Sequence, residues 1–466
     1  MRRKRTKTAN RQNERTGIPL ETKTIWRETE QIDAIYDFSE GYKEFLNAAK
    51  TERLAARAIV EKAKAHGFEE FSEKKTVSRG DKLYVLNKEK SVLLFRIGED
   101  IEAGMRIVAA HIDSPRLDIK ANPLYEEENL ALLKTHYYGG IKKYQWTTIP
   151  LAIHGVIFNK KGEKIEVNIG SDREDPIFTV TDLLPHLSKE QNKKTLAEGI
   201  TGENLNVLFG HKDANDDVKA EILALLKEKY DIEEKDFEIA ELEVVPAFEA
   251  RDLGLDRSMI GAYGQDDRVC AYAAMEALFA AEDPEKTCVA VFADKEEIGS
   301  VGNTSMSARY LENAVAEILY AMGKDSHMAV KRALARSTVL SADVTAAVDP
   351  NYKDVMDAKN AARLGEGVCL MKYTGARGKS GTNDANAEFL SALRMHFSKE
   401  GIRWQVGEMG KVDQGGGGTV AFILAETGAD VVDLGTALLS MHGPFEVASK
   451  ADIYSTYRAY ESFLRM

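Results

Sequence analysis

Histidine and carboxylate side chains recur at the ends of short apolar runs in this sequence, and these residue types bind divalent metal ions. Five segments far apart along the chain contain His111 and Asp113; Asp266 and Asp267; Asp294, Glu296 and Glu297; Asp343; and His442. If the runs are strands of an open α/β sheet, their carboxyl ends face one crevice, where such sheets bind ligands. The sequence therefore predicts that these segments meet at one site.

The number and type of these side chains suit a pair of metal ions. Two imidazoles and three carboxylates, one of them shared, would give each zinc-like ion three protein ligands and leave a place for a shared water. Glu297 would bind metal, and Glu296 would accept a proton from that water as a general base. Asp113 could accept the second ring N–H of His111 and thereby fix its tautomer.

Each segment alone also has an ordinary structural explanation. A His-x-Asp sequence after a strand is commonly a local hydrogen-bonded feature, and Asp-Asp before a helix is typically an N-cap. A Glu-Glu pair is usually solvated, an Asp at a strand end is common in turns, and His442 could be a packed turn histidine. Only the recurrence of such residues at five equivalent positions favours a metal site.

The elements that would position these residues alternate between strand and helix patterns. Helical spacing of apolar residues covers residues 32–66, 217–230, 267–281, 311–322 and 386–400, and strand patterns cover 82–86, 91–96, 105–110, 287–293, 337–342 and 429–435. Such alternation predicts an α/β fold, with a mainly parallel sheet flanked by helices.

The middle of the chain has a different pattern of apolar and charged residues. Residues 146–158 and 164–169 have β-like patterns, 189–236 are highly charged, and 237–245 are again typical of a strand. We therefore expect an inserted β-rich domain at residues 116–254, which divides a catalytic domain into residues 31–115 and 255–466. Residues 1–30, which begin with a basic run, are expected to form a flexible tail.

Composition excludes several classes of function. The 466 residues include 63 Lys and Arg against 75 Asp and Glu, a formal net charge of −12, which disfavours nucleic acid as a partner. No apolar run is long enough to span a membrane. The cysteines, Cys270, Cys288 and Cys369, form no CxxC pair, which argues against a thiolate zinc site and fits a reducing cytoplasm.

The motifs together resemble those of the M18 family of metallo-aminopeptidases, the group of aspartyl aminopeptidase and vacuolar aminopeptidase I. In order they are AAHIDSPR at 109–116, QDDR at 265–268, DKEEIGS at 294–300, SADV at 341–344, PNY at 350–352 and SMH at 440–442. The resemblance runs from about residue 30 to the C-terminus, and the inserted β-rich domain is also a feature of that family.

The resemblance implies a role for each residue of the site. His111 and Asp343 would bind one metal ion, Glu297 and His442 the other, and Asp266 would bridge them. Glu296 would be the general base and later the acid, and Asp113 would orient His111. Such a site removes one residue from the free N-terminus of a peptide. The ligand types suit zinc, and manganese or cobalt also fit them.

The family also implies self-association. Its second domain forms dimers and sends a histidine into the neighbouring subunit's active site, and the matching residue here is His186, within LLPHL at 183–187. A surface or core histidine is the alternative explanation for this residue. Because the family builds tetrahedral dodecamers, we expect one here.

Substrate preference is left open by the sequence. Family members that prefer acidic N-terminal residues carry a basic Lys-Gln-Arg-Tyr-type segment, but residues 372–381 read KYTGARGKSG. Arg377 or Lys379 could select an acidic residue, whereas a solvated loop would leave a neutral or leucine-type preference. Residues 415–418, four glycines, could let the backbone approach the substrate. The other functions considered are a related di-metal deacylase or carboxypeptidase and a catalytically silent assembly protein.

Overall fold

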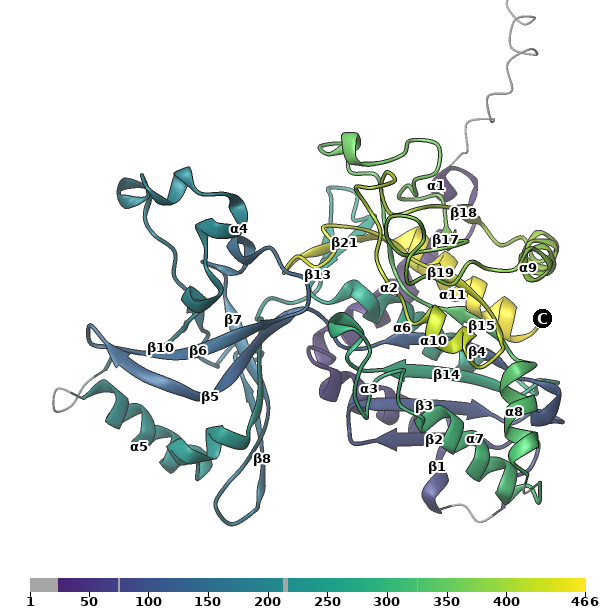
Figure 1. Ribbon diagram of the computed structural model, residues 1–466, viewed down its shortest axis with the longest axis horizontal. Coiled ribbons are helices and arrows are strands. Elements are labelled where there is room, and N and C mark those ends of the chain that lie inside the picture. Colours follow the sequence, from purple (N-terminus) through teal and green to yellow (C-terminus); the bar gives the residue numbers. More distant parts are fainter. Residues whose placement is uncertain (1–23, 74–75, 213–216, 325) are drawn as a thin grey trace, which may run out of the picture.

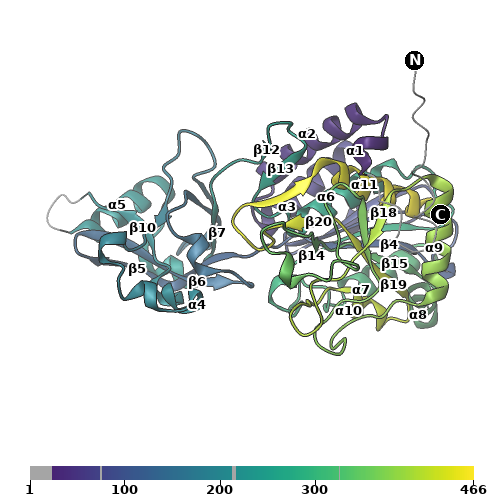
Figure 2. The same cartoon turned by 90° about the horizontal axis from the view of Figure 1, so that it is seen from above.

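The computed structural model describes residues 24–73, 76–212, 217–324 and 326–466. Two lobes are visible from both directions (Figure 1; Figure 2). The large lobe holds a nine-stranded sheet and most of the helices, and the small lobe holds a seven-stranded sheet. Mixed helices and sheets agree with the α/β content expected from the sequence.

The nine-stranded sheet forms the middle of the large lobe. In spatial order its strands are β1 (Glu69–Glu70), β2 (Lys82–Asn87), β3 (Ser91–Arg96), β14 (Cys288–Ala293), β4 (Arg106–His111), β15 (Thr338–Ser341), β19 (Asp430–Gly435), β17 (Val368–Met371) and β18 (Trp404–Val406). The central strands β14, β4, β15 and β19 run parallel, whereas β3 and β17 are antiparallel to them. Every residue of β14 is buried, as an apolar strand covered on both faces requires.

Helices cover both faces of this sheet. On one face, packed with Val108 and Ala110 of β4, lie α2 (Ile32–Ala48), α3 (Glu52–Ala65), α6 (Gln265–Ala280), α9 (Ala387–Glu400) and α11 (Lys450–Leu464). On the other, with Ile107 and Ala109, lie α7 (Tyr310–Ala321), α8 (His327–Ala335) and α10 (Ala421–Ala425). Alternate residues of β4 therefore face opposite cores, as strand geometry dictates.

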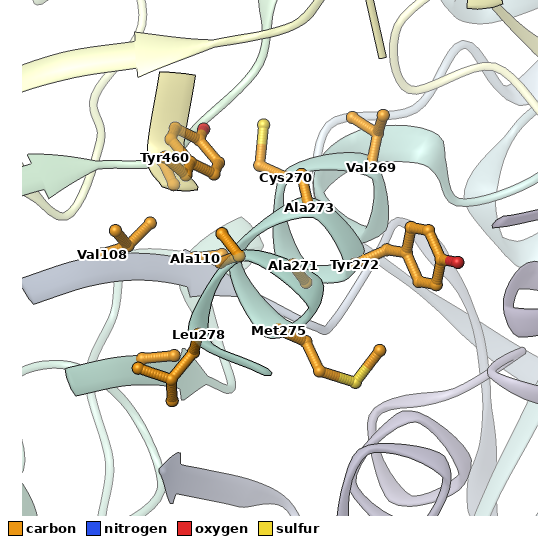
Figure 3. Close-up of a cluster of buried hydrophobic side chains, with 14 of the residues drawn as sticks. Val108, Ala110, Val269, Cys270, Ala271, Tyr272, Ala273, Met275, Leu278 and Tyr460 are labelled. Atoms are coloured by element: carbon orange, nitrogen blue, oxygen red, sulfur yellow. The ribbon is translucent and has the colours of Figure 1, made fainter. Parts of the chain in front are cut away.

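Helix α6 is the most deeply buried of these helices, because small residues let it fit between β4 and α11. Figure 3 shows Ala271 and Ala273 of α6 beside Ala110, with Tyr460 of α11 near Cys270. Cys270 and Tyr460 are fully buried. This packing fixes the start of α6, where two of the predicted acidic residues lie.

The small lobe is built from one continuous part of the chain. Its antiparallel sheet has the order β8 (Lys164–Ile169), β7 (Leu151–Phe158), β11 (Glu241–Pro246), β5 (Arg116–Glu127), β6 (Leu130–Tyr138), β10 (Val207–Gly210) and β9 (Thr179–Val180), beside α4 (Leu196–Gly199) and α5 (Val218–Tyr230). It has a hydrophobic core of its own. Strands β5 and β11, where the chain enters and leaves the lobe, are paired.

A third sheet, which the sequence did not indicate, packs against the core of the large lobe through Ile260, Leu438 and Ala448. Its strands are β12 (Arg251–Leu253), β13 (Met259–Ala262), β21 (Glu446–Ser449), β20 (Ala437–Leu439) and β16 (Thr345–Ala346). These strands contain only two to four residues, too few for a clear alternating pattern.

Several boundaries differ from the sequence predictions. The helical stretch 32–66 is two helices, because Thr51 interrupts it and caps α3 by accepting the backbone N–H of Leu54. The strand predicted at 237–245 begins only at Glu241, after a 3-10 turn. The predicted tail falls outside the described residues up to residue 23. Beyond it, α1 (Ile25–Glu28) forms and buries Ile25.

In the described parts of the chain, no helix combines the length and the apolar character that crossing a membrane requires.

Candidate metal centre

Three parallel strands deliver predicted residues to one edge of the large sheet. His111 is the last residue of β4, Asp343 follows β15, and Glu296 and Glu297 lie in a 3-10 turn after β14. His111 pairs in register with Ala293, the last residue of β14, so these strands end at the same level. The expected convergence at the carboxyl ends of parallel strands therefore holds for these segments.

The other two predicted ligands come from the third sheet. Asp266 lies in the first turn of α6, just after β13, and His442 lies in the turn between β20 and β21. His442 has φ of +64°, a left-handed conformation that residues with side chains rarely adopt and that is found at functional sites. Short strands on a separate sheet therefore complete the site.

The five side chains surround one small volume with Asp266 at its centre. His111 Nε2 lies 3.3 Å from Asp266 Oδ1, and His442 Nε2 lies 3.2 Å from Asp266 Oδ2. Glu297 Oε2 is 3.4 Å from His442 Nε2, and Asp343 Oδ1 is 4.0 Å from His111 Nε2. Ligand atoms bound at about 2.0 Å to one tetrahedral zinc ion lie about 3.3 Å apart, so these spacings fit zinc.

Buried negative charge is the second feature that fits a cation. Asp266 Oδ1 and Glu297 Oε1 are buried and accept no hydrogen bond within the described residues. Burial, with Asp266 and Glu296 as neighbouring carboxylates, raises the pKa values of Glu297 and Asp343 well above their usual range. A group of buried acids is costly without a compensating charge, which a divalent ion supplies.

Asp266 itself is stabilised as a carboxylate. Burial acts to raise its pKa, but the neighbouring imidazoles of His111 and His442 hold the pKa below its usual value. The same pairing raises the pKa of His442 to about 10, against the lowering effect of burial. Asp266 therefore has the charge and position of a shared ligand.

Both imidazoles are fixed through their Nδ1 atoms. His111 Nδ1 lies 3.0 Å from the carbonyl oxygen of Asp113, and His442 Nδ1 lies 2.9 Å from that of Gly140. A carbonyl only accepts, so Nδ1 carries the proton and Nε2 is left to bind a metal. The side-chain oxygen of Asp113 is farther from His111 Nδ1, at 3.4 Å.

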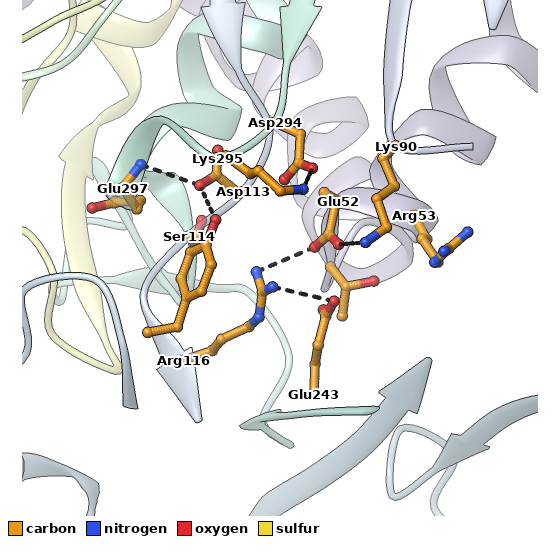
Figure 4. A network of polar contacts seen from close by, with 12 residues as sticks. Glu52, Arg53, Lys90, Asp113, Ser114, Arg116, Glu243, Asp294, Lys295 and Glu297 are labelled. Atoms are coloured by element: carbon orange, nitrogen blue, oxygen red, sulfur yellow. Dashed lines mark hydrogen bonds and ion pairs between the residues drawn. The ribbon is translucent and has the colours of Figure 1, made fainter. Parts of the chain in front are cut away.

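The Asp113 carboxylate contacts the turn after β14. Its oxygens accept the backbone N–H groups of Glu296, at 3.1 Å, and Glu297, at 3.2 Å, and the hydroxyl of Tyr138, at 2.8 Å. Figure 4 shows the contact between Asp113 and Glu297. This buried carboxylate therefore holds the backbone that carries two site residues.

Glu296 faces the same volume, about as close to His111 as Asp343 is. Its Oε2 lies 3.9 Å from His111 Nε2. Burial raises the pKa of Glu296 to about 7, and the Asp113 and Asp266 carboxylates contribute. A carboxyl group with a pKa near 7 can both accept and return a proton at neutral pH.

Two acidic residues that the sequence did not assign support the site. Glu446 accepts the backbone N–H of Asp266, at 3.1 Å, and of His442, at 2.8 Å. The Asp267 carboxylate accepts the backbone N–H of His111. Asp267, His111 and Asp343 also lie close enough together for one ligand atom of each to hold a metal ion. The spacing of Glu446 four residues after His442 was the only available signal.

A cavity of about 410 Å³ opens onto the site. Its apolar wall consists of Val344, Met371, Tyr373, Met409, Val412 and Met441, and glycines 415–418 line it as well. Arg377 and Lys411 lie at this cavity together with Glu408 and Asp413. Lys379 is paired with Asp384 instead, at 2.7 Å.

His186 is not brought to this site within the chain. It lies exposed in a 3-10 turn, Pro185–Leu187, of the small lobe.

Comparisons with known proteins give the family to which this fold belongs. Residues 45–464 match the family described as aminopeptidase I zinc metalloprotease, M18. A probable M18 family aminopeptidase 1 of Clostridium acetobutylicum is 49% identical over 95% of this chain and 98% of its own. The chain therefore belongs to the M18 family and is a peptide hydrolase.

Solved structures agree with this assignment. The crystal structure of an M18 aminopeptidase from Thermotoga maritima superimposes with a TM-score of 0.93 and 49% identity, covering 96% of this chain and all of the other. A dodecamer of yeast mApe1 has the same fold at 19% identity, with a TM-score of 0.75, covering 92% and 97% of the two chains.

Proposed function

We propose that this protein is a two-metal aminopeptidase that removes single residues from the N-termini of peptides. His111 and Asp343 hold one ion, Glu297 and His442 the other, and Asp266 bridges them. The observation that carries this assignment is the position of Asp266, whose two oxygens lie 3.3 Å and 3.2 Å from two different imidazoles. Zinc is the proposed metal, and manganese or cobalt are alternatives.

The bound ions would lower the pKa of a water molecule toward about 7 and polarise the scissile carbonyl. Glu296 is the proposed general base, because its carboxylate faces the site, with Oε2 3.9 Å from His111 Nε2, and could take up the proton of the water and return it to the leaving amine. Asp113 positions Glu296 by accepting its backbone N–H.

Within this function, the cavity favours a neutral, apolar N-terminal residue. Its buried wall includes Met371 and Val344, whereas Arg377 and Lys411 are exposed and accompanied by Glu408 and Asp413. An acidic side chain placed against such a wall would lose hydration without a buried cation to pair with. An acidic preference, selected by Arg377, is the alternative.

Residues 116–254, which contain the small lobe, are proposed to be an inserted dimerisation domain between the parts 31–115 and 255–466 of a catalytic domain. Leu183, Leu184, Leu187 and Leu196 are all at least 45% exposed around His186, an apolar surface that a second copy would cover. His186 would then reach the partner's active site. A tetrahedral dodecamer remains the proposed assembly, and the cytoplasm remains the proposed location.

The deciding experiment compares free and N-acetylated peptides in the presence of zinc, manganese or cobalt. We expect release of the first residue from free peptides alone, and faster cleavage of leucine and methionine anilides than of aspartate and glutamate anilides. Equal cleavage of acetylated peptides would instead indicate a deacylase or carboxypeptidase. No hydrolysis with any of the three metals would favour a catalytically silent assembly protein.

A further inference from the structure

The end of β6 brings the small lobe back to the metal centre. Tyr138, its last residue, pairs with Arg116, the first residue of β5, and β5 directly follows the loop that contains Asp113. The chain therefore leaves the site along β5 and returns to it along β6. Residues 138–140 at this return are TyrGlyGly.

Tyr138 contacts the carboxylate that organises the turn after β14. Its hydroxyl donates to Asp113 Oδ2 at 2.8 Å, while the same carboxylate accepts the backbone N–H groups of Glu296 and Glu297. The guanidinium of Arg116 lies 3.9 Å from the centre of the Tyr138 ring and holds it in place. The hydroxyl therefore limits rotation of the Asp113 carboxyl group.

Gly139 and Gly140 approach two other site residues. A Cβ atom on Gly139 would lie 3.4 Å from Cβ of Glu297, and one on Gly140 would lie 3.4 Å from Nδ1 of His442. The Gly140 carbonyl oxygen accepts the Nδ1 proton of His442 at 2.9 Å. Residues 139 and 140 therefore lie in van der Waals range of Glu297 and His442.

From these contacts we infer that residues 138–140 of the small lobe are positioning residues for the metal centre of the large lobe. They set the direction of His442 Nε2 through Gly140 and the place of Glu296 and Glu297 through Tyr138 and Asp113. This inference rests on the proposed ligand set. It makes the site dependent on contact between the lobes, although the five proposed ligands all belong to the large lobe.

The first test replaces Tyr138 with Phe, which keeps the ring under Arg116 and removes only the hydroxyl. We expect kcat to fall about 10- to 100-fold, as is typical when a partner of a metal ligand is lost, with KM changed less than about twofold. Tyr137→Phe, on the neighbouring exposed residue, is the matched control and should retain wild-type kcat and KM. In the cobalt-substituted enzyme, the visible absorption spectrum of Tyr138→Phe should shift.

The second test replaces Gly140 with Val, because a Cβ there would already be in van der Waals contact with Nδ1 of His442 and the two further methyl groups would displace the ring. We expect one of the two metal ions to bind at least tenfold more weakly, measured by titration of the metal-free protein with zinc. Gly199→Val is the control, because Gly199 also lies in the small lobe and a Cβ there meets nothing within 4 Å.

The outcomes separate this inference from the proposed function. If His442→Ala leaves zinc stoichiometry unchanged, the ligand assignment itself fails. If His442→Ala loses one ion but Tyr138→Phe and Gly140→Val keep wild-type kcat, zinc affinity and cobalt spectrum, only the positioning role is overturned. A lower melting temperature with unchanged kcat would show that residues 138–140 merely support the fold, which also overturns it.

Discussion

At the scale of single residues, the site combines buried carboxylates with two imidazoles whose Nδ1 atoms are held by backbone carbonyls. Glu296 differs from its neighbour Glu297 in this setting. It lies in the same turn, but its nearest imidazole nitrogen is 3.9 Å away, whereas Glu297 lies 3.4 Å from His442. The two adjacent glutamates therefore face different imidazoles, Glu296 that of His111 and Glu297 that of His442.

Replacing Glu296 with Gln should separate proton transfer from metal binding. We expect kcat to fall by about 10²- to 10⁴-fold, because the amide cannot accept the proton, while two zinc ions still bind per chain. Steady-state kinetics together with metal analysis of the purified variant measure both quantities. A variant that loses zinc would indicate that Glu296 is itself a ligand.

Asp433, in the centre of β19, predicts a pH effect on stability. Burial raises its pKa to about 6, and its Oδ2 accepts no hydrogen bond from the described residues. Between about pH 4 and pH 6 the folded protein therefore binds more protons than the unfolded chain, so Asp433 lowers stability as the pH rises, by up to about 1.4 kcal/mol per unit.

The measurement compares the melting temperature of Asp433→Asn with that of the wild type from pH 4 to pH 7. The wild type should lose stability relative to the variant across this range, and the difference should level off above about pH 6. Asp430→Asn, on the exposed start of the same strand, should give a curve parallel to the wild type. Parallel curves for Asp433→Asn as well would contradict the prediction.

The sequence predicted His111, Asp266, Glu297, Asp343 and His442 as one group because each stands next to an apolar run or a helix start. It could not predict Glu446 or Gly140. Both act on backbone atoms or through a backbone carbonyl, so their residue types carry no chemical signature. Gly140 also lies 302 residues from His442, a separation at which short motifs carry no information.

At the scale of elements, one seam joins α3 of the large lobe to the sheet of the small lobe. In it, Arg116 lies between two fully buried carboxyl groups, 3.2 Å from Glu52 and 3.4 Å from Glu243 (Figure 4). Although burial opposes ionisation, Arg116 holds the pKa of Glu52 at about 2. Burial raises the pKa of Glu243, so this carboxyl group binds a proton more readily than an exposed glutamate does.

Removing the buried guanidinium group of Arg116 should strongly destabilise the contact between α3 and the sheet of the small lobe. We expect Arg116→Met to lower the free energy of unfolding by about 3–5 kcal/mol, because it leaves the charge of Glu52 without its principal partner. Arg57→Met is the control, since Arg57 spans the same seam to Glu166 with both side chains at least 40% exposed. Arg57→Met should lower the free energy of unfolding by no more than about 1 kcal/mol. Urea denaturation measures this quantity for both variants. Similar losses for both variants would contradict this account.

The main elements were predictable where hydrophobic periodicity is strong, as in α2, α9 and the buried strand β14. The third sheet was not, because β16 and β20 have only two and three residues. Its role in presenting Asp266 and His442 arises from pairing between distant strands, as in β13 with β21. Local sequence does not encode such pairing.

At the scale of the whole molecule, the exposed leucines around His186 predict an interface. Replacing Leu184 and Leu187 with Glu should shift the protein toward monomers, because charges would have to be buried at the contact. Analytical ultracentrifugation measures the shift. Met395→Glu, on an exposed position of α9, should keep the wild-type size.

His186→Ala should preserve assembly and lower kcat, since the proposed role of His186 is in the partner's site. An unchanged distribution of sizes for Leu184→Glu with Leu187→Glu would place the interface elsewhere.

The spread of the metal-binding residues along the chain, from His111 to His442, has a consequence for synthesis. During translation, β4 is made long before β14 and β15, the strands that flank it, and His442 is the last of the five proposed ligands to be added. The small lobe, one unbroken segment with its own core, is free to fold earlier. The complete set of proposed ligands can therefore come together only after the small lobe has been synthesised.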